Sequence, residues 1–140
     1  MKKSTIISVI FLLSILFVNG QSTLPDVTIR DLQGKQIQTS TFQNDGKPII
    51  LSFWATWCKP CVREFNTLND VYEDWQDEFG VKIIAVSVDD ARTSNNVAPF
   101  VNAKAWDFDF YIDVNHDFKR AMNVNLVPHL FILNGDGEVV

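Results

Sequence analysis

The sequence predicts an α/β domain, in which helices flank a sheet, because its apolar residues change period along the chain. Residues 49–54 form an apolar run that is too short and too rich in β-branched and aromatic residues for a helix, which indicates a strand buried on both faces. A second β-branched run at residues 81–88 indicates another strand. Between the two runs, from about residue 60 to 79, apolar residues recur at helical steps of three and four: Phe65, Leu68, Tyr72, Trp75 and Phe79.

Residues 1–20 are predicted to be a signal peptide that is removed, so that the domain occupies residues 21–140. Lys2 and Lys3 precede an apolar run from residue 6 to 18, and small or permissive residues lie before the cleavage point. The alternative is an uncleaved membrane anchor, but this run is shorter than the roughly 20 apolar residues that span a bilayer. We therefore expect an exported protein.

The formal net charge of −5 at pH 7 narrows the choice of partners. After the leader, the basic residues are scattered along the chain rather than clustered. A chain without a basic patch lacks the electrostatic footprint of proteins that bind nucleic acids or anionic lipids, so we expect neither partner.

Weaker patterns predict the other elements. Residues 27–29 and 35–38 alternate like strands around a turn at residues 31–34, which predicts a small N-terminal hairpin. Pro48 suits the start of the central strand, and Gly80 suits the end of the long helix. The later segments are predicted to be a helix, a strand, a helix, a strand and a turn into a final strand: residues 97–105, 108–112, 116–122, 130–133 and 134–140.

Cys58 and Cys61, the only cysteines, lie where the central strand ends and the long helix begins. The N–H groups and dipole at a helix N-terminus favour an anion, so Cys58 should ionise more readily than a free thiol of pKa about 8.5. Its thiolate can attack a disulfide, and Cys61, about one turn further on, can then displace the mixed disulfide. A purely structural disulfide closing so short a loop would add only roughly 2 kcal/mol. The pattern therefore predicts redox chemistry, with Cys58 as the nucleophile and Cys61 as the resolving thiol.

Metal binding is the alternative use of the two cysteines. Zinc motifs place two histidines three to five residues apart, whereas His116 and His129 are much more widely separated. Residues 113–117 look like the start of a calcium loop, but Phe118 and Val124 stand where that loop requires glycine and glutamate. We expect no metal site, and a metallochaperone using the cysteines stays open as an alternative.

Two separated motifs resemble those of the thioredoxin superfamily. One is Phe53-Trp54-Ala55 followed by Trp57-Cys58-Lys59-Pro60-Cys61, and the other is Val127-Pro128 before an apolar strand. Together with the leader, they are most similar to the exported TlpA/ResA-like branch. The resemblance implies a thioredoxin-like central mixed sheet flanked by helices, with an N-terminal β-hairpin. It also implies a thiol-disulfide oxidoreductase whose only redox group is its own disulfide.

The same resemblance implies partners and a location. It favours a reductant in the periplasm or at the extracytoplasmic face of the cell envelope, kept reduced by a membrane electron donor. Its substrates would be protein disulfides, for example those of apocytochromes. Dithiol potentials on this framework run from about −270 to −120 mV, so a disulfide-forming oxidant is the alternative.

Five further residues acquire roles from the resemblance. Trp57 would be an exposed platform for the substrate, or else would simply pack over the helix start. Pro128 would follow a cis peptide bond beside the cysteines, leaving the backbone of Val127 to pair with an extended substrate. Lys59 and Pro60 would tune the redox poise, although a surface charge such as Lys59 contributes under about 1 kcal/mol.

The chain departs from the family pattern in two places. Ser52 stands where cytosolic thioredoxins carry a buried aspartate that helps to deprotonate the resolving cysteine. TlpA/ResA-like proteins often have an acidic residue after the second central strand instead, and Asp89 and Asp90 lie there. Asp90 is the candidate for redox tuning, unless both are solvated loop residues. His129 replaces a usual threonine, either as a strand-edge residue or as a proton shuttle.

Thioredoxin-like domains normally complete the last strand and add a C-terminal helix. Because the chain stops at Val140, we expect it to be incomplete, with one face of the sheet uncovered. An uncovered apolar face would make the chain poorly soluble or less stable.

Overall fold

The computed structural model describes residues 23–140, so the predicted signal peptide lies outside the described residues. Within them, six strands form one mixed sheet with the order β2-β1-β5-β4-β3-β6. The strands are β1 (Thr28–Asp31), β2 (Gln36–Gln38), β3 (Ile49–Trp54), β4 (Lys82–Ser87), β5 (Asp109–Ile112) and β6 (His129–Leu133). The predicted N-terminal hairpin is present as the antiparallel pair β1 and β2, with Ile29 opposite Ile37.

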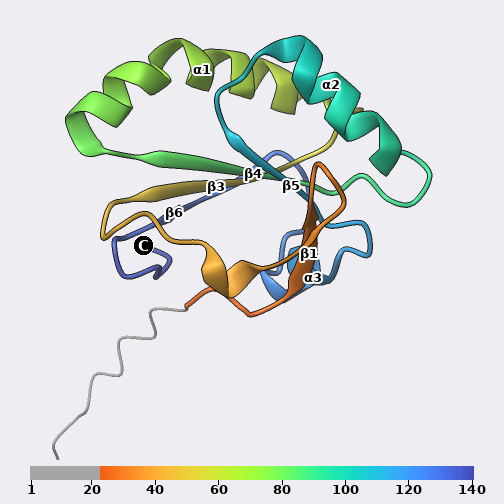
Figure 1. The fold of residues 1–140 in the computed structure, drawn as a ribbon, viewed down its shortest axis with the longest axis horizontal. Coiled ribbons are helices and arrows are strands. Elements are labelled where there is room, and N and C mark those ends of the chain that lie inside the picture. The colour runs from red at the N-terminus through yellow and green to blue at the C-terminus, as the bar shows by residue number, and fades with distance from the viewer. Residues whose placement is uncertain (1–22) are drawn as a thin grey trace, which may run out of the picture.

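Three α-helices flank this sheet in the described part of the chain: α1 (Lys59–Phe79), α2 (Val97–Lys104) and α3 (Asp117–Ala121). Figure 1 shows α1 and α2 together on one side of the sheet and α3 on the other, close to β1. Two short 3-10 turns, η1 (Thr39–Thr41) and η2 (Ser94–Asn96), were not predicted. The predicted fold class, a central mixed sheet flanked by helices, is confirmed.

The central strand β3 positions the site. All its residues are buried, as its apolar run predicted. It runs parallel to β4 and antiparallel to β6, with Phe53 opposite His129. One end of the sheet therefore brings together three segments that are far apart in the sequence: the carboxyl ends of β3 and β4 and the start of β6.

Aromatic side chains fill the core between the sheet and α1. Trp54 is fully buried, as predicted for a core residue, and its ring centroid lies 5.2 Å from that of Phe65 and 5.9 Å from that of Trp106. Phe65 and Trp106 meet edge to face at 5.3 Å. This packing fixes the start of α1 against the end of β3, because Trp54 belongs to the strand and Phe65 to the helix.

The apolar stripe of α1 is only partly buried. Phe65 and Tyr72 lie in the core, whereas Phe79 is 54% exposed. Ile132 on β6 is also exposed, at 48%. These two side chains border a groove of about 280 Å³, which we call the β6 groove and which is lined by Pro48, Ile50, Trp75, Phe79, Val81 and Ile132.

The predicted final strand does not form as a regular element. The turn after β6 is present, since the N–H of Gly137 donates to the carbonyl of Asn134 at 3.0 Å. Beyond it the chain forms two isolated bridges, Leu133 with Val139 and Thr23 with Glu138, and the N–H of Val140 donates to the carbonyl of Ile132 at 3.0 Å. The prediction of a strand over residues 138–140 is therefore wrong, because an isolated bridge is not a continuous ladder of paired residues.

Candidate active site

Cys58 and Cys61 lie at the N-terminus of α1, as predicted, and are joined by a disulfide with a Cα–Cα distance of 5.3 Å. Cys58 is the N-cap residue, and its sulfur accepts a hydrogen bond from the N–H of Cys61 at 3.3 Å. Cys61 is fully buried, whereas Cys58 keeps 5% of its surface exposed. Of the two cysteines, only Cys58 keeps a small exposed surface, and the helix N-terminus stabilises a thiolate there.

The second motif lies beside the first. The Val127-Pro128 peptide bond is cis, as the resemblance implied. Phe53, near the end of β3, pairs with His129, the first residue of β6, in antiparallel register. The cis bond therefore lies at the same end of the sheet as the loop that carries Cys58. His129 begins the edge strand β6 and packs against Phe131 with a ring-centroid distance of 4.7 Å.

The residues around the cysteines are open to solvent. Trp57 is 61% exposed, so most of its side chain faces solvent, and its role as a platform for the substrate stays a prediction. Lys59 and Pro60 are also exposed at the surface of the first turn of α1. The surface on both sides of Cys58 in the sequence is therefore open to solvent, while Cys58 itself is only slightly exposed and Cys61 is buried.

The two adjacent aspartates differ sharply in environment. Asp89 is fully buried, and its carboxylate accepts hydrogen bonds from the N–H and hydroxyl of Thr56, at 2.8 and 2.6 Å, and from the hydroxyl of Ser87 at 2.6 Å. Thr56 belongs to the loop between β3 and Cys58. The interpretation of Asp89 as a solvated loop residue is wrong, because its carboxylate holds that loop against the end of β4.

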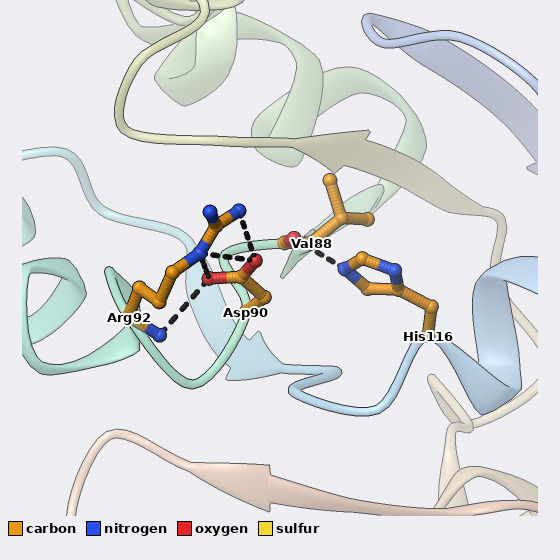
Figure 2. Close-up of polar contacts among 4 residues, drawn as sticks. All are labelled: Val88, Asp90, Arg92 and His116. Atoms are coloured by element: carbon orange, nitrogen blue, oxygen red, sulfur yellow. Dashed lines mark hydrogen bonds and ion pairs between the residues drawn. The ribbon is translucent and has the colours of Figure 1, made fainter.

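Asp90 points away from this network. Its carboxylate accepts hydrogen bonds from the guanidinium of Arg92, the shortest at 2.7 Å, and these bonds hold the pKa of Asp90 below its usual value (Figure 2). The charge of His116 acts in the same direction. The pair is exposed, so Asp90 is a solvated loop residue, and a redox-tuning role for it stays a prediction.

Glu64 is a candidate that the sequence analysis missed. It lies three residues after Cys61 in α1, and residues at this spacing share one face of a helix. Burial raises the pKa of Glu64 above its usual value, partly offset by a hydrogen bond from the Ser52 hydroxyl at 3.4 Å. Ser52 of β3 therefore donates a hydrogen bond to a carboxylate that α1 supplies. In the family pattern of cytosolic thioredoxins, the carboxylate stands at the position of Ser52 itself. The Cys-x-x-Glu spacing was the available sequence signal.

Within residues 23–140, no group of three or more His, Cys, Asp or Glu side chains gathers in a way that could hold a metal ion. In the same part of the chain, no helix is both long and apolar enough to cross a membrane.

The model of the AhpC/TSA family matches residues 21–140. The chain belongs to the AhpC/TSA family. This match covers both the cysteine motif and the cis-proline loop.

Relatives that are similar to this chain include proteins named thiol-disulfide oxidoreductases. ResA of Geobacillus kaustophilus (strain HTA426) is 36% identical over 118 residues, which are 84% of this chain and 65% of the relative. ResA of Bacillus subtilis (strain 168) is 32% identical over 123 residues, 88% of this chain and 66% of the relative. The chain therefore spans slightly less than two thirds of the length of these relatives.

Solved structures confirm the thioredoxin-like fold. The solution structure of an uncharacterized thioredoxin-like protein from Porphyromonas gingivalis is 48% identical, with a TM-score of 0.75 over 84% of this chain and 76% of that one. The crystal structure of StoA from Bacillus subtilis shares the fold at 23% identity, with a TM-score of 0.62 over 83% of this chain and 84% of that one.

Proposed function

We propose that the protein exchanges thiols and disulfides with client proteins through Cys58 and Cys61, and that it acts as a reductant outside the cytosol. The observation that carries this proposal is the disulfide at the N-terminus of α1, beside the cis bond of Pro128, with Cys61 fully buried and Cys58 slightly exposed. The names of the ResA relatives, thiol-disulfide oxidoreductases, support the same chemistry.

The exchange takes place in two displacement steps. In the reduced protein, the Cys58 thiolate attacks one sulfur of a client disulfide, so that a Cys58–client disulfide forms and the first client thiolate leaves. The Cys61 thiolate then attacks the Cys58 sulfur, which forms the Cys58–Cys61 disulfide and releases the second client thiolate. Two electrons pass from the cysteine pair to the client. The two protons lost by the pair balance those taken up by the client thiolates.

The second step requires a base for the buried Cys61. We infer that Glu64 accepts this proton, because it lies on the same helical face and its partly buried carboxylate has a raised pKa. A base with a pKa closer to neutral is better matched to a thiol than an ordinary carboxylate. The Ser52 hydroxyl would orient the carboxylate through its hydrogen bond at 3.4 Å.

Other residues would bind the client or tune the pair. Trp57 offers an exposed aromatic surface, and the backbone of Val127, before Pro128, would pair with an extended client segment. Lys59 and Pro60, between the cysteines, would adjust the redox potential of the pair. None of these roles needs a further cofactor.

The reductant direction also needs an electron source. We propose that the leader at residues 1–20 exports the protein to the periplasm or the extracytoplasmic face of the envelope. A membrane electron donor would then return the Cys58–Cys61 disulfide to the dithiol, and clients such as apocytochromes would consume it.

A trapping experiment tests the exchange. The Cys61→Ser variant should accumulate on clients as a Cys58 mixed disulfide, because the second displacement is blocked. Adducts would be recovered from cells under non-reducing conditions and should disappear on reduction. The double variant Cys58→Ser/Cys61→Ser is the matched control, and recovery of no adduct specific to Cys58 would refute the exchange.

The direction of electron flow is tested by equilibrating the Cys58–Cys61 pair with glutathione. We expect a potential near or below about −250 mV, as for a reductant. A value above about −150 mV would instead assign the protein as a disulfide-forming oxidant.

A further inference from the structure

A second groove lies next to Cys58. It has a volume of about 160 Å³ and brings together the active-site loop, the end of β4, the start of α3 and the cis-proline loop. We call it the Trp57 groove, lined by Trp57, Val88, His116, Lys119, Asn125, Leu126 and Val127. Trp57 directly precedes Cys58 and Val127 directly precedes Pro128, so the groove borders both motifs of the site.

Two of the residues that line the Trp57 groove are apolar and exposed. Trp57 is 61% exposed and Leu126 is 79% exposed. Large apolar side chains that stay open to water beside a site mark a place where a partner contacts the protein. A cavity of about 150 Å³ accommodates a benzene molecule, so this groove has room for one bulky apolar side chain.

The lining of the Trp57 groove also carries a positive charge. Lys119 is half-buried in the groove, and none of the lining residues is a carboxylate. Among residues 23–140, the ion pairs join Lys82 to Asp109, Arg92 to Asp90 and Arg120 to Asp117. Residues 1–22 contain no Asp or Glu. Lys119 therefore keeps an uncompensated charge, in a chain whose formal net charge is −5.

The nearby acidic groups are occupied elsewhere. The Asp90 carboxylate is bonded to Arg92, and the Asp113 carboxylate accepts the backbone N–H of Lys119 at 2.7 Å. His116, at the start of α3, lies 2.8 Å through its Nε2 from the carbonyl of Val88, which ties α3 to the end of β4 (Figure 2). Lys119 thus projects from a helix that is fixed to the site.

We propose that the Trp57 groove selects client segments that carry a bulky apolar side chain and an acidic side chain next to the reactive cysteine. The apolar side chain lies between Trp57 and Leu126, and the carboxylate pairs with Lys119. This inference rests on the proposed thiol-disulfide exchange, and it adds a class of substrate to it.

Disulfide peptides of matched sequence test this selection. Each peptide has one internal disulfide and a leucine next to the first cysteine, and the following position is Glu, Gln or Lys. The reduced protein is mixed with each peptide, and the peptide thiols formed are measured at low ionic strength. Each rate is divided by the rate with hydroxyethyl disulfide, an uncharged small substrate, so that changes in the reactivity of Cys58 itself cancel.

We expect the Glu peptide to react about fivefold faster than the Lys peptide, with the difference shrinking in 1 M salt, as for a partly exposed charge pair. Lys119→Gln should abolish this preference, Lys119→Arg should retain it and Lys119→Glu should reverse it. Lys35→Gln, which removes an exposed lysine of the β1–β2 turn, should leave it unchanged. Leu126→Ser should slow all the leucine peptides relative to hydroxyethyl disulfide.

Equal rates for the Glu and Lys peptides, or a preference that survives Lys119→Gln, would overturn the selection while leaving thiol exchange intact. No reaction with hydroxyethyl disulfide would instead overturn the exchange itself, and the selection with it. The two failures are therefore distinguishable.

Discussion

At the scale of single residues, the carboxylate of Glu64 makes a prediction about pH. Because burial raises its pKa, it accepts the Cys61 proton only at a pH above that raised value. The rate of the resolving step in the wild-type protein should therefore fall as the pH drops through it. Glu64→Gln should slow this step by about a hundredfold, the lower end of typical general-base effects, and should remove the inflection.

The step is measured as release of the second client thiol from a preformed Cys58 mixed disulfide. Glu73→Gln, an exposed position on the same helix, is the matched control and should retain the wild-type pH profile. Ser52→Ala should move the inflection to higher pH, because it removes the hydrogen bond that lowers the pKa of Glu64. An unchanged profile in Glu64→Gln would show that another group takes the proton.

Asp89 and Asp90 give a second prediction at this scale, on stability. Asp89→Ala leaves the half-buried N–H and hydroxyl of Thr56 and the buried hydroxyl of Ser87 without their acceptor. We expect the free energy of unfolding in urea to fall by about 3 kcal/mol. Asp90→Ala, one residue further along and exposed, should leave the urea midpoint almost unchanged. Similar losses in both variants would contradict a specific role of Asp89 in holding the active-site loop.

At the scale of elements, the sequence predicts what local pattern determines. The apolar run of β3 and the three-and-four spacing of apolar residues in α1 predict these two elements. The position of Cys58 between them predicts its place at the helix N-terminus. Asp89 and Asp90 look alike in the sequence, and only the contact with Thr56, which comes from another element, separates them. The Trp57 groove could not be predicted either, because Trp57, Lys119 and Leu126 come from three separate segments.

The end of α1 carries a prediction for the helix as a unit. Gly80 ends it in the left-handed region, with φ of 63°, and its N–H donates to the carbonyl of Gln76 at 2.8 Å. Gly80→Ala should lower the free energy of unfolding by about 1–2 kcal/mol, because alanine rarely adopts this conformation. Gly80→Asn should lose less, since asparagine visits it more readily. Thermal and urea unfolding measure the difference.

The lower free energy of unfolding in Gly80→Ala could also come from a steric clash, and this cause can be separated from the backbone conformation. A Cβ at Gly80 would also contact the side chain of Lys47. Repeating Gly80→Ala in a Lys47→Ala background removes this contact. The loss should persist there if backbone conformation is its cause, and its disappearance would assign it to the steric clash instead.

At the scale of the whole molecule, the exposed apolar surface decides how the protein behaves in solution. Phe79 and Ile132 border the β6 groove, and β6 is an edge strand of the sheet. An exposed apolar edge favours association between chains. We expect the protein to bind a hydrophobic dye and to self-associate. The double variant Phe79→Gln/Ile132→Thr should reduce both several-fold. It should change the free energy of unfolding by only about 0.5 kcal/mol, as for exposed positions.

The control for this surface is Ile37→Thr, which also lies on a strand but outside the β6 groove. It should leave dye binding as in the wild-type protein, because it does not alter the apolar lining. Dye fluorescence, sedimentation and reversible melting would be compared across the three proteins. If the wild-type protein binds no dye and melts cooperatively and reversibly, the β6 groove does not drive association. The exposed apolar groove would then be tolerated in water by the isolated chain.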